Sequence, residues 1–126
     1  MKNRKNRLDQ REAATRDSWN TLPMPAKHVT VPMDIPLTAG QMANVRLGHI
    51  PMAMEDHWFM YCTDSRICYH RSWTGFCIFE ADYEASGDGF RVTGLTINTD
   101  PDQHTATPQE AEERFRGLLS SSCREG

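Results

Sequence analysis

Residues 57–83 read HWFMYCTDSRICYHRSWTGFCIFEADY, and this stretch decides the fold. It consists of runs rich in aromatic and apolar residues, separated by a short polar turn at residues 63–65 and a polar corner at residues 72–75. Runs of this composition between turn residues are typical of β-strands. Together with a later run of the same kind, they predict strands at His57–Cys62, Arg66–His70, Phe76–Glu84 and Phe90–Asn98.

The connections between these strands are no longer than five residues. Parallel neighbours need a crossover of about a dozen residues or more, so the strands are expected to form an antiparallel meander. The sequence therefore predicts an α+β fold: a meander of about four strands, a short helix before it and a C-terminal helix packed on one face.

The signals for the two helices are local. Thr38 is a suitable N-cap and Gly48 a suitable stop, so we predict a helix at Ala39–Leu47. Residues 107–110 read TPQE, which combines an N-cap, a proline at the first helical position and a glutamate three residues after the cap. These residues predict a C-terminal helix that ends near Leu119. Residues 29–31 alternate like a short strand, and Pro32 and Pro36 restrict the following residues to a sheet edge or a loop.

The predicted domain organisation has three parts. Residues 1–25 are polar and mildly basic, and they are expected to form a disordered or partly helical tail rather than an arm that binds nucleic acid. Pro23 and Pro25 mark its end, with a boundary near residues 21–26. Residues 26–120 are expected to form the single α+β domain, and residues 121–126 a frayed end.

Composition excludes several classes of protein. A net charge of −3 argues against a surface that grips nucleic acid, and no apolar run approaches the length of a membrane span. Three of the four cysteines lie within predicted strands among apolar residues, as reduced thiols of a cytoplasmic protein would. Zinc would need converging ligands, but no CxxC motif occurs and alternation sends Cys62 and Cys68 to opposite faces, so no metal is expected at His57, Cys62, Cys68, His70 and Cys77. No cofactor is expected either.

A two-residue turn at Asp64-Ser65 would fix the pairing of the first two strands of the meander. It places Phe59 opposite His70, and the remaining pairs are Trp58 with Arg71, Met60 with Tyr69, and Cys62 with Ile67. Side chains alternate between the faces of a sheet. The face predicted to meet the helix carries Trp58, Met60, Cys62, Ile67 and Tyr69, with Arg71 at its rim beside Trp58. The other face carries His57, Phe59, Tyr61, Cys68 and His70, and we expect it to be an open ligand surface.

The residues most suggestive of a site are Tyr69, His70, Arg71, Ser72, Trp73, Thr74 and Gly75. A guanidinium beside hydroxyls and backbone N–H groups is a donor set that phosphates and carboxylates bind, and the aromatic rings could contact a base or sugar. Two structural roles compete with this hypothesis. Arg71 could form an internal salt bridge with Asp56 or Glu80, and the hydroxyls of Ser72 and Thr74 could serve the turn.

Residues 37–103 resemble a family of small bacterial proteins of uncharacterised function. The resemblance rests on VRLGHIP at 45–51, DHWF at 56–59, YHRSWTG at 69–75, CIF at 77–79 and INTDPDQ at 97–103, with HRSWTG as the specific core. Some members carry an automatic 8-oxoguanine DNA glycosylase label. The region that is similar has neither a helix-hairpin-helix pattern nor a catalytic lysine, so the label does not change our reading of these residues.

Three functions stay open from the residues. The first is a non-catalytic module that binds a phosphorylated or nucleotide-like small molecule at Arg71. The second is a small hydrolase or transferase in which His70 is the general acid or base and Arg71 stabilises negative charge. The third is a protein-interaction domain. The binding module ranks highest because the spacing of residues in the sequence does not indicate a complete set of catalytic side chains.

Overall fold

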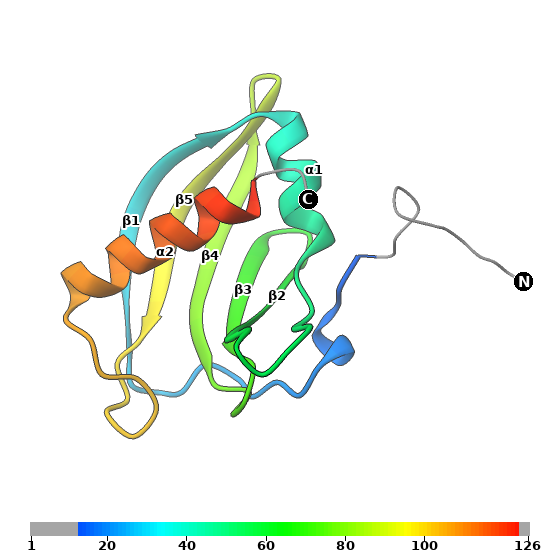
Figure 1. Cartoon of the computed structure of the whole chain (residues 1–126). Coiled ribbons are helices and arrows are strands. Elements are labelled where there is room, and N and C mark those ends of the chain that lie inside the picture. Colours follow the sequence, from blue (N-terminus) through cyan, green and yellow to red (C-terminus); the bar gives the residue numbers. More distant parts are fainter. Residues whose placement is uncertain (1–12, 124–126) are drawn as a thin grey trace, which may run out of the picture.

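The computed structural model of the chain describes residues 13–123 and contains one antiparallel sheet with two helices. The strands are β1 (His28–Leu37), β2 (Trp58–Cys62), β3 (Arg66–Arg71), β4 (Cys77–Ser86) and β5 (Gly89–Asn98), in the spatial order β1-β5-β4-β3-β2. Helix α2 (Pro108–Ser122) crosses one face of the sheet, and α1 (Ala39–Leu47) lies beside its upper end (Figure 1). The predicted α+β class is confirmed, with five strands in place of about four.

The additional strand is β1, which has ten residues where the sequence predicted a short strand at residues 29–31. It pairs along its length with β5 and forms one edge of the sheet, with a register shift between Pro32 and Ile35. Proline is tolerated at an edge because only one side of the strand has a neighbour there.

Both helices begin at the predicted caps. The Thr38 hydroxyl accepts a hydrogen bond from the Gln41 N–H, and Thr107 accepts one from the Glu110 N–H in the same way. Helix α1 has the predicted bounds and stops at Gly48, which has a φ of 73°. Helix α2 continues three residues beyond the predicted end at Leu119, so Ser121 and Ser122 are helical rather than frayed. None of the helices in residues 13–123 is long and apolar enough to span a bilayer.

The pairing of β2 with β3 has the predicted register, with Trp58 opposite Arg71 and Cys62 opposite Ile67. The face that carries Met60, Ile67 and Tyr69 is buried, as predicted. It packs in one core with Ala111, Phe115 and Leu119 of α2 and with Met42 and Val45 of α1. Register and core are therefore confirmed together, because the side-chain period of two couples them.

The opposite face of β2 and β3 is not an open surface, and this prediction is wrong. Four of its five predicted residues, Phe59, Tyr61, Cys68 and His70, are buried. They are covered by residues 13–22, which we call the N-terminal strap. Ala14 and Trp19 of the strap pack in a second core with Phe59, Tyr61 and Cys68. Alternation along a strand shows which residues share a face but not what covers that face.

The strap is held to the rest of the domain by backbone hydrogen bonds near both of its ends. The Ala14 N–H donates to the Leu47 carbonyl at 2.9 Å, the Leu22 N–H donates to the Gly75 carbonyl at 2.9 Å, and a 3₁₀ turn at Arg16–Ser18 lies between them. Packed structure therefore begins before the predicted boundary near residues 21–26. The first twelve residues of the predicted tail, which was expected to span residues 1–25, lie outside the described residues.

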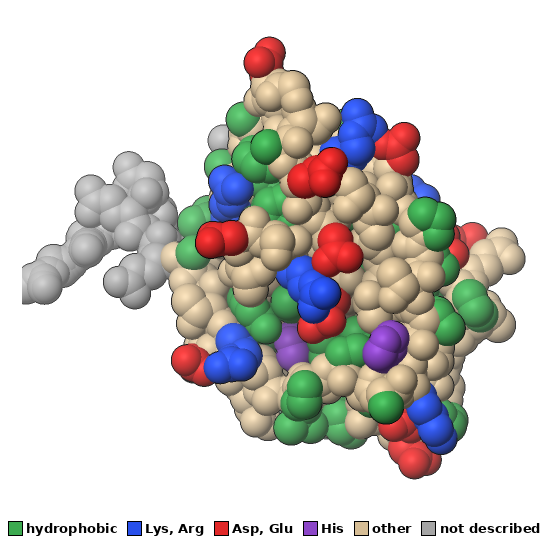
Figure 2. Space-filling view, turned by 180° about the vertical axis from the view of Figure 1, so that it is seen from behind, with side chains coloured by type: hydrophobic (Ala, Val, Ile, Leu, Met, Phe, Trp, Pro, Cys, Tyr) green, Lys and Arg blue, Asp and Glu red, His purple; other side chains and the backbone are tan. Residues whose placement is uncertain are grey.

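Away from the strap, the same side of the sheet is polar. Arg66 pairs with Asp82 at 2.9 Å and with Glu80 at 3.4 Å. Figure 2 shows acidic and basic side chains close together near the middle of this side.

Candidate anion-binding site

A cavity of about 470 Å³, which we call the arginine pocket, opens beside Arg71. It lies between the β3–β4 corner, the loop before α2 and the first half of α2. Its walls are formed by His57, Arg71, Ser72, Trp73, Thr74, Phe76, Ile78, Gln103, His104, Thr105 and Arg114. Two of these side chains are arginines and none is acidic. The pocket is therefore positively charged.

Arg71 is held in place by stacking. Its guanidinium carbon lies 4.8 Å from the centre of the Trp58 ring, within the range of a cation–π interaction, and Arg71 is beside Trp58 as predicted. The indole of Trp58 is itself stacked on Phe79, with ring centres 6.0 Å apart. Because two packed aromatic residues support it from below, the guanidinium has a defined position at the pocket wall.

The alternative role of Arg71, an internal salt bridge to Asp56 or Glu80, is not observed. Asp56 instead contacts Nε2 of His49 at 2.6 Å, and Glu80 pairs with Arg66 on the other side of the sheet. Within residues 13–123, no carboxylate lies within 4.0 Å of the Arg71 guanidinium.

Electrostatics disfavour this arrangement in the absence of an anion. Burial lowers the pKa of Arg71, and the neighbouring charge of Arg114 lowers it further. A guanidinium stays protonated in spite of such shifts. An anion bound between the two guanidinium groups would therefore offset their mutual repulsion and stabilise both charges.

The hydroxyls of Ser72 and Thr74 form hydrogen bonds with the backbone around the turn, which was the structural alternative to ligand binding. Ser72 Oγ donates to the carbonyl of Asp56 at 2.8 Å, and Thr74 Oγ1 accepts from the Phe76 N–H at 3.2 Å. The backbone is also occupied, since the Ser72 and Gly75 N–H groups donate to the carbonyls of His57 and Arg71. The predicted cluster of accessible N–H groups is therefore not present at these two positions, and the arginines are the principal anion donors.

Not all of the predicted site residues converge. Arg71, Ser72, Trp73 and Thr74 line the arginine pocket, whereas His70 points to the buried opposite face. The ring of His70 stacks against Tyr61, and its Nδ1 donates to the Gly75 carbonyl at 2.9 Å. Burial lowers the pKa of His70. His70 and Arg71 lie on different faces of the sheet, so the geometry does not support their predicted catalytic partnership.

Tyr69 and Gly75 do not line the arginine pocket either. The Tyr69 hydroxyl reaches Ser122 at 3.1 Å in a different cavity. Gly75 has the positive φ expected of it, 80°, and supports the corner from the side of the strap. A Cβ at this position would lie 2.7 Å from the Asn20 carbonyl oxygen, so the close approach requires glycine.

Sequence reasoning missed the second arginine and misplaced one histidine. Arg114 lies three residues after Ala111 and four before Leu118, so a helical wheel puts it beside the apolar stripe of α2. The sequence thus indicates on which side of the helix Arg114 lies, but it does not indicate the direction in which α2 crosses the sheet. His57 precedes β2, so strand alternation does not extend to it, and it lines the arginine pocket instead of the opposite face.

His104 also lines the pocket. Its Nδ1 lies 2.8 Å from the Asn98 carbonyl, which makes Nδ1 the donor. Its Nε2 is buried without a hydrogen-bond partner among the described residues.

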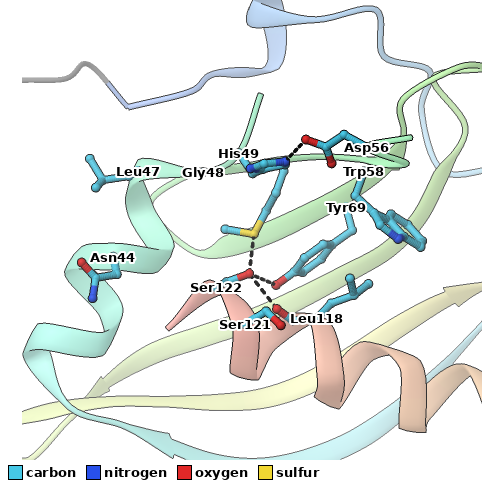
Figure 3. A pocket seen from close by; sticks show the side chains of 11 residues that line it. Asn44, Leu47, Gly48, His49, Asp56, Trp58, Tyr69, Leu118, Ser121 and Ser122 are labelled. Carbon is cyan, nitrogen blue, oxygen red and sulfur yellow. Dashed lines mark hydrogen bonds and ion pairs between the residues drawn. The ribbon is translucent and has the colours of Figure 1, made fainter. Parts of the chain in front are cut away.

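A second cavity of about 360 Å³, which we call the tyrosine cavity, lies between the end of α1, the loop that follows it and the end of α2. Figure 3 shows Asn44 and Leu47 on one side, Leu118, Ser121 and Ser122 on another, and the His49–Asp56 pair above them. Tyr69, Trp58 and Met60 of the sheet complete its wall.

The residues that the structure describes contain no cluster of three or more His, Cys, Asp or Glu side chains suited to a metal ion. Comparison of the chain with protein-family models, with curated proteins and with solved structures found no match. The resemblance carried by the HRSWTG core stays a prediction, and the function is argued from the site alone.

Proposed function

We propose that the protein binds a phosphorylated small molecule, with the phosphate in the arginine pocket. The observation that carries the proposal is the pairing of Arg71 and Arg114 at a wall without an acidic residue. Arginine offers a planar fork of donors that matches phosphate oxygens, and the hydrogen bonds are strengthened because both partners are charged.

The neighbouring side chains support a phosphate over a simple halide ion. His57, Gln103 and Thr105 line the same pocket, and each has polar atoms suited to a tetrahedral oxyanion with several acceptor oxygens. The cavity is within the size range of small-molecule sites. We also propose that this binding takes place in the cytoplasm, because all four cysteines are free thiols.

Binding of ribose 5-phosphate, followed by isothermal titration calorimetry at low salt, tests the proposal. Arg71→Gln and Arg114→Gln should each weaken binding about tenfold or more, because each removes charge-assisted hydrogen bonds worth roughly 1.5–3 kcal/mol. Arg46→Gln is a matched control. The Arg46 guanidinium also stacks on an aromatic ring, at 4.7 Å from the centre of Phe90, but it does not line the pocket.

The proposal fails if no saturable binding is found, or if Arg71→Gln and Arg114→Gln bind as tightly as the folded Arg46→Gln protein. Circular dichroism on each variant separates loss of the site from loss of the fold.

A protein-interaction domain is the second candidate, because an exposed apolar group lies beside the pocket. Met52 is 86% exposed, Met54 is 71% exposed and Trp73 is 67% exposed. The indole of Trp73 donates to the Met54 carbonyl at 3.0 Å, so the two residues form one surface. Self-association measured by sedimentation, and lost in a Met52→Ser, Met54→Ser variant, would favour this candidate.

A further inference from the structure

The arginine pocket and the tyrosine cavity have no lining residue in common, but both are bordered by α2 and by the chain segment at residues 56–58. On α2, Arg114 lines the first, while Leu118, Ser121 and Ser122 line the second. These positions are separated by four, seven and eight residues, so they form a single face of the helix. Across from α2, the consecutive residues Asp56 and His57 line one cavity each, and the Ser72 hydroxyl ties the Asp56 carbonyl to the arginine corner at 2.8 Å.

The two cavities differ in chemistry. The arginine pocket is cationic, whereas the tyrosine cavity combines the apolar side chains of Leu47, Met60 and Leu118 with polar side chains, which are those of Asn44, His49, Asp56, Tyr69, Ser121 and Ser122. A molecule that occupied both would need an anionic end and a compact apolar group with polar edges.

Asp56 lines the tyrosine cavity and is followed in the chain by His57, which lines the arginine pocket. Both hydrogen bonds that described residues make to the Asp56 side chain, from His49 at 2.6 Å and from the Met52 N–H at 3.2 Å, end on Oδ2. Oδ1 is therefore the acceptor left for a ligand. Carboxylates in this role accept hydrogen bonds from sugar hydroxyls.

We propose that the ligand is a nucleoside monophosphate that lies along α2. The phosphate contacts Arg71 and Arg114, the ribose hydroxyls contact Asp56 Oδ1, and the base occupies the tyrosine cavity against Met60 and Leu118. This assignment rests on the proposed phosphate site and adds the class of molecule that the phosphate belongs to.

Four probes separate the contributions: inorganic phosphate, ribose 5-phosphate, uridine or adenosine 5′-monophosphate, and the unphosphorylated nucleosides. At least one nucleoside monophosphate should bind about tenfold or more tightly than ribose 5-phosphate, because it also removes the apolar surface of the base from water. The nucleoside without phosphate should bind more weakly than its monophosphate.

Ser121→Trp and Ser120→Trp form a matched pair. Both serines are exposed on α2, but only Ser121 lines the tyrosine cavity, whereas Ser120 lies at another surface of the helix. Ser121→Trp should fill the cavity and remove the advantage of the monophosphate while leaving the affinity for ribose 5-phosphate unchanged. Ser120→Trp should retain the advantage.

Equal affinity for ribose 5-phosphate and both monophosphates would overturn the nucleotide assignment and leave the phosphate site standing. Failure of all phosphorylated probes would instead overturn the proposed function itself. A nucleoside that bound as tightly as its monophosphate, with no effect of Arg71→Gln, would show that the cavities act separately and would also overturn the assignment.

Discussion

Removing the indole of Trp19 should destabilise the protein by about 3 kcal/mol. The indole N–H donates to the Ser72 carbonyl at 2.8 Å, a hydrogen bond worth about 1 kcal/mol. The ring is stacked on the fully buried Phe59 at 6.3 Å, and an aromatic pair of this kind contributes about 1 kcal/mol beyond area. Lost apolar burial adds about 1 kcal/mol more in a half-buried position.

Urea unfolding of Trp19→Ala measures this loss, which corresponds to a midpoint lowered by about 1–3 M at the urea slopes usual for a small domain. Trp73→Ala is the matched control, because the Trp73 indole also donates to a backbone carbonyl but its ring is mostly exposed. Its loss should be about 1 kcal/mol or less.

The Trp19→Ala variant has a second readout, the reactivity of a buried thiol, which does not depend on global stability. Burial raises the pKa of the Cys68 thiol to about 11 and shields it, so the native protein should react slowly there with a thiol reagent. Trp19→Ala should speed labelling of Cys68 in native buffer, as mapped by peptide mass spectrometry. Equal stability losses for Trp19→Ala and Trp73→Ala, with no change in Cys68 labelling, would refute our account of the strap.

Two further predictions concern the corner and the buried face. Gly75→Ala should destabilise the protein more than Gly87→Ala does. Both glycines have a positive φ, but only at position 75 would a Cβ lie 2.7 Å from the Asn20 carbonyl oxygen. Thermal melts of the two variants provide the comparison. The lowered pKa of His70 means that the unfolded chain takes up its proton first, so stability should decline as the pH falls below the ordinary histidine pKa of about 6.5. His70→Asn keeps a donor near the Gly75 carbonyl and should flatten this part of the stability profile relative to the parent protein.

The parts of the fold that could be predicted from sequence depend on short-range geometry. The β2–β3 register follows from a two-residue turn between alternating runs, and the starts of α1 and α2 follow from Thr38 and Thr107 as caps. Arg71 at the rim of the core, stacked on Trp58, follows from the same register.

The parts that could not be predicted depend on contacts between distant segments. Trp19 meets Ser72 across 53 positions, and nothing in the polar composition of residues 13–22 indicates which face they would cover. Arg114 reaches the site only because α2 crosses the sheet at one particular angle. Local patterns determine the rotation of a helix about its own axis but not its path over a sheet.

The prolines of β1 have a consequence for encounters between copies of the chain. β1 is an outermost strand of the sheet (Figure 1), and an unprotected strand in that position could recruit a second molecule by main-chain pairing. Pro32 and Pro36 have no N–H to offer an incoming strand, and the register shift between Pro32 and Ile35 interrupts the regular spacing that such pairing requires. Pro32 and Pro36, which led the sequence analysis to expect only a short strand at residues 29–31, would thus protect the folded protein against fibrillar stacking at high concentration.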